Sequence, residues 1–281
     1  MTTHHISTNK LANTRVLIVG GTSGIGFAVA RLALEHGASI IVASSQPQKV
    51  ASAITRLKTY YPDPEYTARI AGTVCDLSDE STLESNILAL YAFATDPNTF
   101  PAQQGGTTED KILLDHIVTT AGDALNLRTP TDPTFDVPYI KSTGTVRLVA
   151  GLILAKHAPA YVRNAPSSSL TFTSGVNTTR PMPGWTIGAA QGAAVEGMAR
   201  GLALDLAPIR VNTVSPGAVL TELFGRLGKE GLEAFVEVCK KGTLTGEIGR
   251  PEDVAEAYLY LMKDRFVTGA LVHSHGGRLL K

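Results

Sequence analysis

The chain has 281 residues, of which 43% are hydrophobic and 18% charged, and its 25 basic residues balance 25 acidic ones to a formal net charge of zero. This composition is typical of a globular protein with a sizeable buried core. A chain without net charge creates no long-range field for polyanions, so neither nucleic acid nor a membrane surface is expected as a partner.

The N-terminal stretch is polar and lacks the apolar core of a signal peptide. The longest apolar runs, such as "LVAGLILA", are too short to span a bilayer. We therefore expect a cytoplasmic protein with a disordered tail at residues 1–12 and one domain at residues 13–281.

The chain shows no pattern of metal ligands. Cys75 and Cys239 lie far apart and match no ligand spacing, which predicts buried or idle thiols in a reducing compartment. His273 and His275 share a face of the last strand but lack a third ligand. No metal site is expected.

The first half of the chain alternates β-branched runs with segments of helical periodicity. The strands are predicted at 15–21, 39–44, 69–77 and 113–122, and the helices between them at 25–38, 49–61 and 81–94. The second half continues with a helix at about 140–160, a strand at 169–175, a small-residue helix at about 187–206, and strands at 209–217 and 270–277. This alternation predicts an α/β fold whose parallel sheet has helices on both faces.

Three further segments stand outside this alternation. Residues 61–68 and 95–111 are rich in Pro, Gly and Thr and are predicted as long surface loops. Residues 224–241 form an amphipathic segment, with Leu232 and Phe235 at helical spacing. Neither a repeat nor a linker divides the chain.

The stretch "GGTSGIG", residues 20–26, lies between the first predicted strand and the first helix. Backbone N–H groups in such a turn, together with the positive end of the helix, can bind a pyrophosphate. Glycine-rich turns also arise for packing, so the motif alone is weak evidence. Its position between a strand and a helix strengthens it.

The motifs "GGTSGIG", "CDL", "TTAG" and "IRVNTVSPGAVLTE" follow one another in an order and spacing that resembles the short-chain dehydrogenase/reductase family over nearly the whole chain. The resemblance implies a Rossmann-type, doubly wound parallel sheet in a single domain. It also implies a homo-oligomer, a dimer or tetramer, because the small residues of "GAAQGAAVEG" would let central helices pack closely.

The same resemblance implies where a dinucleotide would bind. The pyrophosphate would contact the turn at Gly20, Thr22, Ser23, Gly24, Ile25 and Gly26. The adenine would lie at Asp76 and Leu77, and the ribose along Thr120, Ala121 and Gly122. The nicotinamide amide would lie among Pro216, Gly217, Val219 and Thr221.

The end of the second strand indicates which dinucleotide binds. An acidic residue there would bind the ribose 2′-hydroxyl and repel a 2′-phosphate. This chain instead has Ser44, Ser45 and Gln46 as hydrogen-bond donors, with Lys49 within reach, which favours NADPH as the cofactor. The serines could alternatively cap the following turn.

The stretch "AAQGAAVEG", residues 189–197, lies where the family carries its catalytic tyrosine and lysine. Aligned on "AAVEG", the two positions hold Gly188 and Gly192; aligned on Ser174, they hold Ile187 and Gln191. Neither register restores the pair. Carbonyl reduction needs a proton as well as a hydride, whereas an iminium carbon needs the hydride alone.

A narrower resemblance connects "GTVR", "SLTFTSG", "PGW" and "GAAVEGMARGLALDL" with the fungal bifunctional reductase/Diels-Alderases of bridged indole alkaloid pathways. In that group an arginine, an aspartate and a tryptophan shape the substrate pocket. Arg147 and Trp185 match, but Met182 occupies the place of the aspartate.

Four candidate catalytic residues follow: Arg147, Trp185, Ser174 and Asp123. Arg147 either meets a carboxylate or substrate oxygen, or extends to water. Trp185 either walls the pocket or packs, and Asp123 either faces the nicotinamide or stabilises a turn.

The leading hypothesis is an NADPH-dependent reductase of specialised metabolism that delivers hydride to an iminium-like or conjugated group of a small-molecule substrate. The alternatives are a non-redox cyclase or isomerase that keeps NADP(H) as part of its pocket, and an NADP(H)-binding protein without turnover. Residues 224–241 occupy the place of the family's mobile substrate lid.

Overall fold

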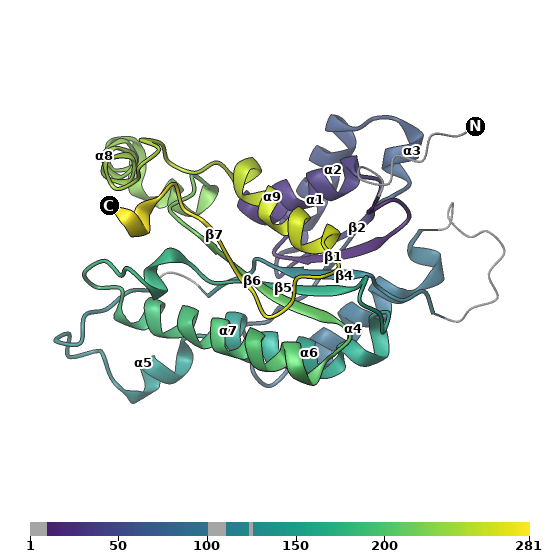
Figure 1. Ribbon diagram of the computed structural model, residues 1–281, viewed down its shortest axis with the longest axis horizontal. Helices are drawn as coiled ribbons and strands as arrows, with labels where there is room; N and C mark the ends of the chain where they lie inside the picture. The colour runs from purple at the N-terminus through teal and green to yellow at the C-terminus, as the bar shows by residue number, and fades with distance from the viewer. Residues whose placement is uncertain (1–9, 101–110, 124–125) are drawn as a thin grey trace.

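The computed structural model describes residues 10–100, 111–123 and 126–281. Its centre is a parallel sheet in the order β3-β2-β1-β4-β5-β6-β7 (Figure 1). The strands are β1 Arg15–Val19, β2 Ser39–Ser44, β3 Ile70–Val74, β4 His116–Thr119, β5 Ser169–Thr173, β6 Arg210–Pro216 and β7 Leu271–Ser274. The order reverses between β1 and β4, which makes the sheet doubly wound, as the sequence predicted.

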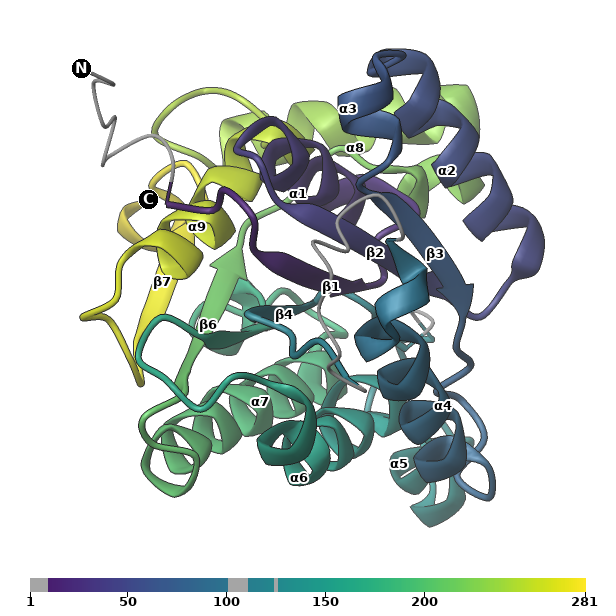
Figure 2. The same cartoon turned by 90° about the vertical axis from the view of Figure 1, so that its right-hand side faces the viewer.

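Two layers of helices cover the sheet (Figures 1 and 2). One layer contains α1 Gly24–Glu35, α2 Pro47–Tyr60 and α9 Pro251–Lys263, and the other contains α4 Leu83–Thr95, α6 Ala150–Tyr161 and α7 Thr186–Asp205. Alternate residues of each strand point to opposite faces. Val16 and Ile18 therefore join the core under α1 and α9, while Leu17 and Val19 join the core under α4, α6 and α7.

Helix α9 was not predicted, although the sequence signals it. Pro251 takes the first helical position, Glu252 and Asp253 lie in the first turn, and Tyr258 and Leu259 are buried. The two predicted loops also contain short helical turns, α3 Pro64–Thr67 and a 3-10 turn at Pro97–Thr99. Each turn has a proline at its start. Residues 101–110 lie outside the described residues.

The single helix predicted at about 140–160 is wrong. The structure divides this stretch into α5 Val137–Ser142, a π-helix at Thr145–Val149 and α6. Gly144 lies between α5 and the π-helix, which runs directly into α6; its φ of +83° is one that only glycine adopts readily, and a Cβ there would overlap the Gln191 side chain. The break therefore lies at a glycine that is in contact with a distant helix.

Leu11 is packed into the fold: its side chain is 1% exposed, and its carbonyl accepts hydrogen bonds from the Thr14 backbone and hydroxyl. Residues 1–9 of the predicted tail lie outside the described residues. Among the helices described here, none is long and apolar enough to cross a membrane.

Candidate active site

The residues predicted to contact a dinucleotide are brought together at the carboxyl edge of the sheet. Gly20 follows β1, Ser44 ends β2, Asp76 follows β3, Thr120 follows β4 and Pro216 ends β6. In doubly wound sheets ligands bind outside this edge, where the strand order reverses. The fold thus places these positions around one site although they are spread over two hundred residues.

The glycine-rich turn packs directly against the end of β4. Gly20 has a φ of +91° and Gly24 a φ of +50°. A Cβ on Gly26 would overlap the Gly20 carbonyl oxygen and the Thr120 hydroxyl, so only glycine fits there. The close contact brings the start of α1 against the end of β4, and N–H groups at a helix start can bind an anion.

The start of α1 has the character of an anion site. The helix has no acidic residue in its first turn, and the N-cap residue Ser23 makes no side-chain cap. The Gly24 N–H instead donates to the Glu222 carboxylate at 2.9 Å. A carboxylate from a distant segment therefore lies where a pyrophosphate oxygen would bind, which fits a dinucleotide at this turn.

The end of β2 carries no acidic side chain. Ser44 is half-buried, Ser45 is exposed, and Lys49 lies exposed in the first turn of α2. Asp76, predicted at the adenine, accepts hydrogen bonds from the Ser78 backbone and hydroxyl at 2.9 and 2.7 Å.

Arg147 lies in the π-helix and crosses the ends of β4 and β5. Its Nη1 donates to the carbonyl oxygens of Thr173 and Ser174 at 3.3 and 3.2 Å. Nη2 packs so closely on Gly122 that a Cβ there would lie 2.7 Å away. Burial lowers the pKa of Arg147, and the nearby Tyr258 and Asp123 oppose this shift. The arginine is thus held by backbone carbonyls at the floor of the site.

Asp123 holds the backbone of the π-helix. One carboxylate oxygen accepts from the Val146 N–H at 3.0 Å, and the other accepts from the Arg147 N–H at 3.3 Å. Of the two readings of Asp123, the geometry therefore matches the turn-stabilising one. It orients the segment that carries Arg147.

The glycine pair of α7 faces the site, and its side-chain space is occupied. A Cβ on Gly188 would lie 3.1 Å from the Trp185 ring. A Cβ on Gly192 would lie 2.6 Å from the Thr178 methyl group and 4.0 Å from Ser174 Cβ. The Thr178 methyl group thus occupies the position where a side chain on Gly192 would begin, and the Trp185 ring lies in tight contact with that position on Gly188.

In the other register, Ile187 and Gln191 have contacts of their own. Ile187 is buried in the core at 9% exposure. The Gln191 amide donates to the Thr143 carbonyl and hydroxyl at 3.4 and 3.2 Å. Gln191 therefore ties α7 to the turn in front of the π-helix, whereas a Cβ on Gly192 would lie 4.0 Å from Ser174 Cβ.

Some of the buried polar atoms without a partner in the described part of the chain lie at the same edge, while others, on Ser168, Thr171 and Thr213, lie before or within the strands. Ser174 is 5% exposed and Ser215 is fully buried, and both hydroxyls lack a protein partner. The two residues directly follow the paired positions Thr173 and Val214, so they are neighbours. Asn177 Oδ1, Gln191 Oε1 and His275 Nδ1 also lack partners. Such atoms usually hydrogen-bond to water or to a ligand.

Tyr258 of α9 lies against the end of β5, and the sequence did not predict this position. Its hydroxyl lies 2.6 Å from the Thr173 hydroxyl, which donates to the Thr119 carbonyl at 2.6 Å. Burial raises the pKa of Tyr258, so the phenol stays neutral. No local signal marks it, because its partner lies on a strand 85 residues away.

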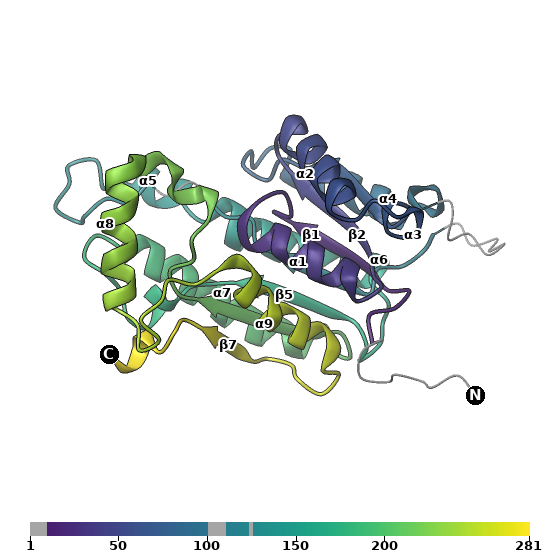
Figure 3. The same ribbon diagram turned by 90° about the horizontal axis from the view of Figure 1, so that it is seen from above.

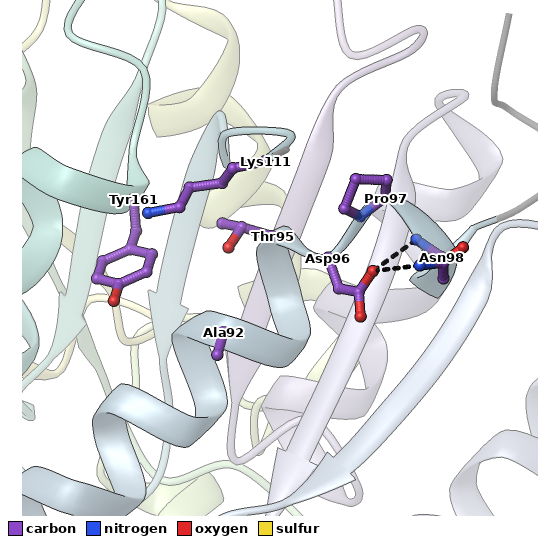
Figure 4. A pocket seen from close by; sticks show the side chains of 7 residues that line it. All are labelled: Ala92, Thr95, Asp96, Pro97, Asn98, Lys111 and Tyr161. Carbon is purple, nitrogen blue, oxygen red and sulfur yellow. Dashed lines mark hydrogen bonds between the residues drawn. The ribbon is translucent and has the colours of Figure 1, made fainter. Parts of the chain in front are cut away.

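A hollow lies at the amino edge of the sheet, opposite the edge that carries the candidate site; Figure 4 shows the residues that line it. It is lined by Ala92, Thr95, Asp96, Pro97, Asn98, Lys111 and Tyr161. The Lys111 amine lies 4.0 Å from the centre of the Tyr161 ring, and Asp96 accepts from Asn98. No candidate catalytic residue lines this hollow.

Metal and thiol chemistry find no support in the described residues. They contain no group of three side chains that could hold a metal ion. Cys75 is buried, which raises the pKa of its thiol to about 11, and Cys239 is also a free thiol.

Similarity to known proteins extends over nearly the whole chain. The family model described as an SDR-like Rossmann domain matches residues 7–281. The short-chain dehydrogenase/reductase malC of Malbranchea aurantiaca is 40% identical over 98% of this chain and 98% of its own. The short-chain dehydrogenase/reductase ucsE of an Acremonium species is 39% identical over 97% of each chain.

Solved structures of other proteins have the same fold as this chain. The MalC reductase/Diels-Alderase of Malbranchea aurantiaca superposes with a TM-score of 0.87 at 41% identity, over 98% of this chain and 100% of that chain. A short-chain dehydrogenase of Burkholderia cenocepacia, solved with NADP, gives a TM-score of 0.76 at 22% identity, over 96% of this chain and 100% of its own. The latter similarity is one of fold.

Proposed function

The chain belongs to the short-chain dehydrogenase/reductase family, and from this premise we propose that it is an NADPH-dependent reductase of fungal specialised metabolism. It delivers hydride to an iminium-like or conjugated group of a small molecule. The full-length similarity to a reductase/Diels-Alderase supports the assignment. Further copies of the chain are its expected partners.

One observation carries this proposal: the space of the proton-transferring pair is filled. The Trp185 ring lies over Gly188, and the Thr178 methyl group lies over Gly192. Hydride transfer to a ketone would leave an alkoxide beside apolar groups, which is costly without a proton donor. An iminium or conjugated iminium carbon is already activated, so its reduction needs no acid from the protein.

The chain's own residues would bind and orient such a substrate. Bound NADPH would supply the hydride. Arg147 and the unpartnered Ser174 hydroxyl offer hydrogen bonds to substrate oxygens at the floor of the site. Trp185 would supply a flat apolar wall. Met182 has no carboxylate, so substrate charge would not be paired there.

A cyclase is the second candidate, because the solved relative is named for both activities. A cyclase would need only a rigid pocket, with NADP(H) as part of its wall. A protein that binds the dinucleotide without turnover is the third.

Deuterium transfer distinguishes these candidates. With NADPH deuterated on the transferred face, a reductase passes its label to the product, and NADP+ does not support the reaction. A cyclase forms unlabelled product with either form of the cofactor. Mass spectrometry of the product reports the outcome. Product formation with NADP+ alone would overturn the reductase assignment, and dinucleotide binding without any product would favour the third candidate.

NADPH should bind at least about tenfold more tightly than NADH, a difference of about 1.4 kcal/mol. The reason is the acid-free end of β2, where Ser45 and Lys49 are exposed to a 2′-phosphate. Fluorescence titration of both cofactors measures the ratio. Ser45→Asp should reduce the preference by repelling the phosphate, whereas equal affinities in the unmodified protein would contradict the prediction.

A further inference from the structure

We propose that Glu222 is a latch between the cofactor site and the substrate lid, and that dinucleotide binding releases it. The inference rests on the proposed binding of NADPH at the glycine-rich turn. The Glu222 carboxylate accepts from the Gly24 N–H, in the turn where the family resemblance puts the pyrophosphate, so cofactor binding there must displace it.

The contact of Glu222 with α1 is specific. Its Oε2 accepts from the Gly24 N–H at 2.9 Å, across 198 residues of sequence. The preceding residue, Thr221, places its methyl group 2.9 Å from the position of a Cβ on Gly24. The family resemblance puts Thr221 at the nicotinamide and Gly24 at the pyrophosphate. Glu222 thus joins two parts of one cofactor site.

The carboxylate and a pyrophosphate exclude each other. Both are anions that need the N–H groups at the start of α1, and this helix supplies no acidic first-turn side chain. The negative charges of the Glu222 carboxylate and of a pyrophosphate bound beside it would also repel each other. The energy of the Glu222 contact therefore opposes cofactor binding and lowers the apparent affinity.

The latch extends to the lid because Glu222 begins a 3-10 turn, Glu222–Leu227, that continues directly into α8 Gly228–Lys241. The Phe224 ring of this turn packs on the Phe235 ring of α8, with centroids 4.4 Å apart. None of the α8 residues is buried. Helix α8 lies at the same end of the molecule as α5 (Figures 1 and 3). Release of Glu222 therefore frees the turn that anchors the lid.

Glu252 supplies a matched control. It lines the same small hollow as Gly24, Thr221 and Glu222. Its carboxylate pairs with Arg31 at 3.7 Å and is 62% exposed. Removing its charge changes the local field and the ion pair with Arg31 in the middle of α1, but it leaves the hydrogen bond of Glu222 to the Gly24 N–H intact.

The test measures NADPH affinity by calorimetric titration for the unmodified protein, Glu222→Ala, Glu222→Gln and Glu252→Gln. Both Glu222 variants should bind NADPH about two- to fivefold more tightly, the size of one charge interaction at a helix terminus. Glu252→Gln should bind like the unmodified protein. Equal or weaker binding by the Glu222 variants, or an equal gain from Glu252→Gln, overturns the latch.

Limited tryptic digestion measures how accessible the lid is, through the rate of cleavage after Lys229, Lys240 and Lys241. NADPH should speed this cleavage in the unmodified protein, whereas Glu222→Ala should already be cleaved quickly without cofactor. Unchanged cleavage in both comparisons contradicts the latch. If the unmodified protein binds no dinucleotide, the proposed function fails and the latch with it. If it binds normally but the Glu222 variants show no gain, only the latch fails.

Discussion

Gly26→Ala is expected to abolish measurable dinucleotide binding and to destabilise the fold by about 1–3 kcal/mol, the usual cost of overpacking. The added methyl group would overlap the Gly20 carbonyl oxygen and the Thr120 hydroxyl. Relief requires α1 to move away from the end of β4. That movement would misplace the N–H groups that a pyrophosphate needs.

Thermal unfolding and NADPH titration measure the two effects of Gly26→Ala. Gly201→Ala is the matched control, because Gly201 lies in α7 and a Cβ there meets nothing within 4 Å. It should stabilise the protein by roughly 0.5–1 kcal/mol, since alanine loses less backbone entropy in a helix. Normal affinity in Gly26→Ala would show that the turn does not bind the cofactor.

Arg147→Ala is expected to lower turnover of the true substrate by about 100-fold, the cost of a substrate misplaced by about 1 Å when a hydrogen bond that orients it is lost. The reason is that the filled space over Gly188 and Gly192 leaves few groups that can hydrogen-bond a substrate. NADPH affinity should change little, because Arg147 approaches the dinucleotide motifs only at Gly122.

Steady-state kinetics and NADPH titration check this expectation, with unfolding curves to report the loss of donors to the Thr173 and Ser174 carbonyls. Arg163→Ala is the control for loss of one positive charge, since that side chain is 54% exposed and pairs with Asp115. Turnover of Arg147→Ala within twofold of the unmodified protein would remove Arg147 from the site.

The substrate-binding half of the site was only partly accessible from sequence. Arg147, Trp185 and Ser174 could be named from motifs, and the structure brings them to one edge of the sheet. The roles of Thr178, Glu222 and Tyr258 could not be read from motifs, because each acts through a residue on another element: Gly192, Gly24 and Thr173. Asp123 was named, but only its contacts show that it holds the π-helix.

The sequence by itself determined the alternation of strands and helices, a parallel sheet with helices on both faces and the position of the glycine-rich turn. These features depend on local periodicity and on the backbone freedom of glycine, both of which are properties of short segments. The missing tyrosine and lysine were equally visible, since either alignment register shows their absence.

Only the tertiary structure decided what replaces the pair and where the predicted helix at 140–160 breaks. The Trp185 ring over Gly188, the Thr178 methyl group over Gly192 and the Gln191 amide against Gly144 are contacts between segments that meet only after the chain has folded. Steric fit between packed elements has no periodic signature along the chain. For this reason the register of the site became visible only in three dimensions.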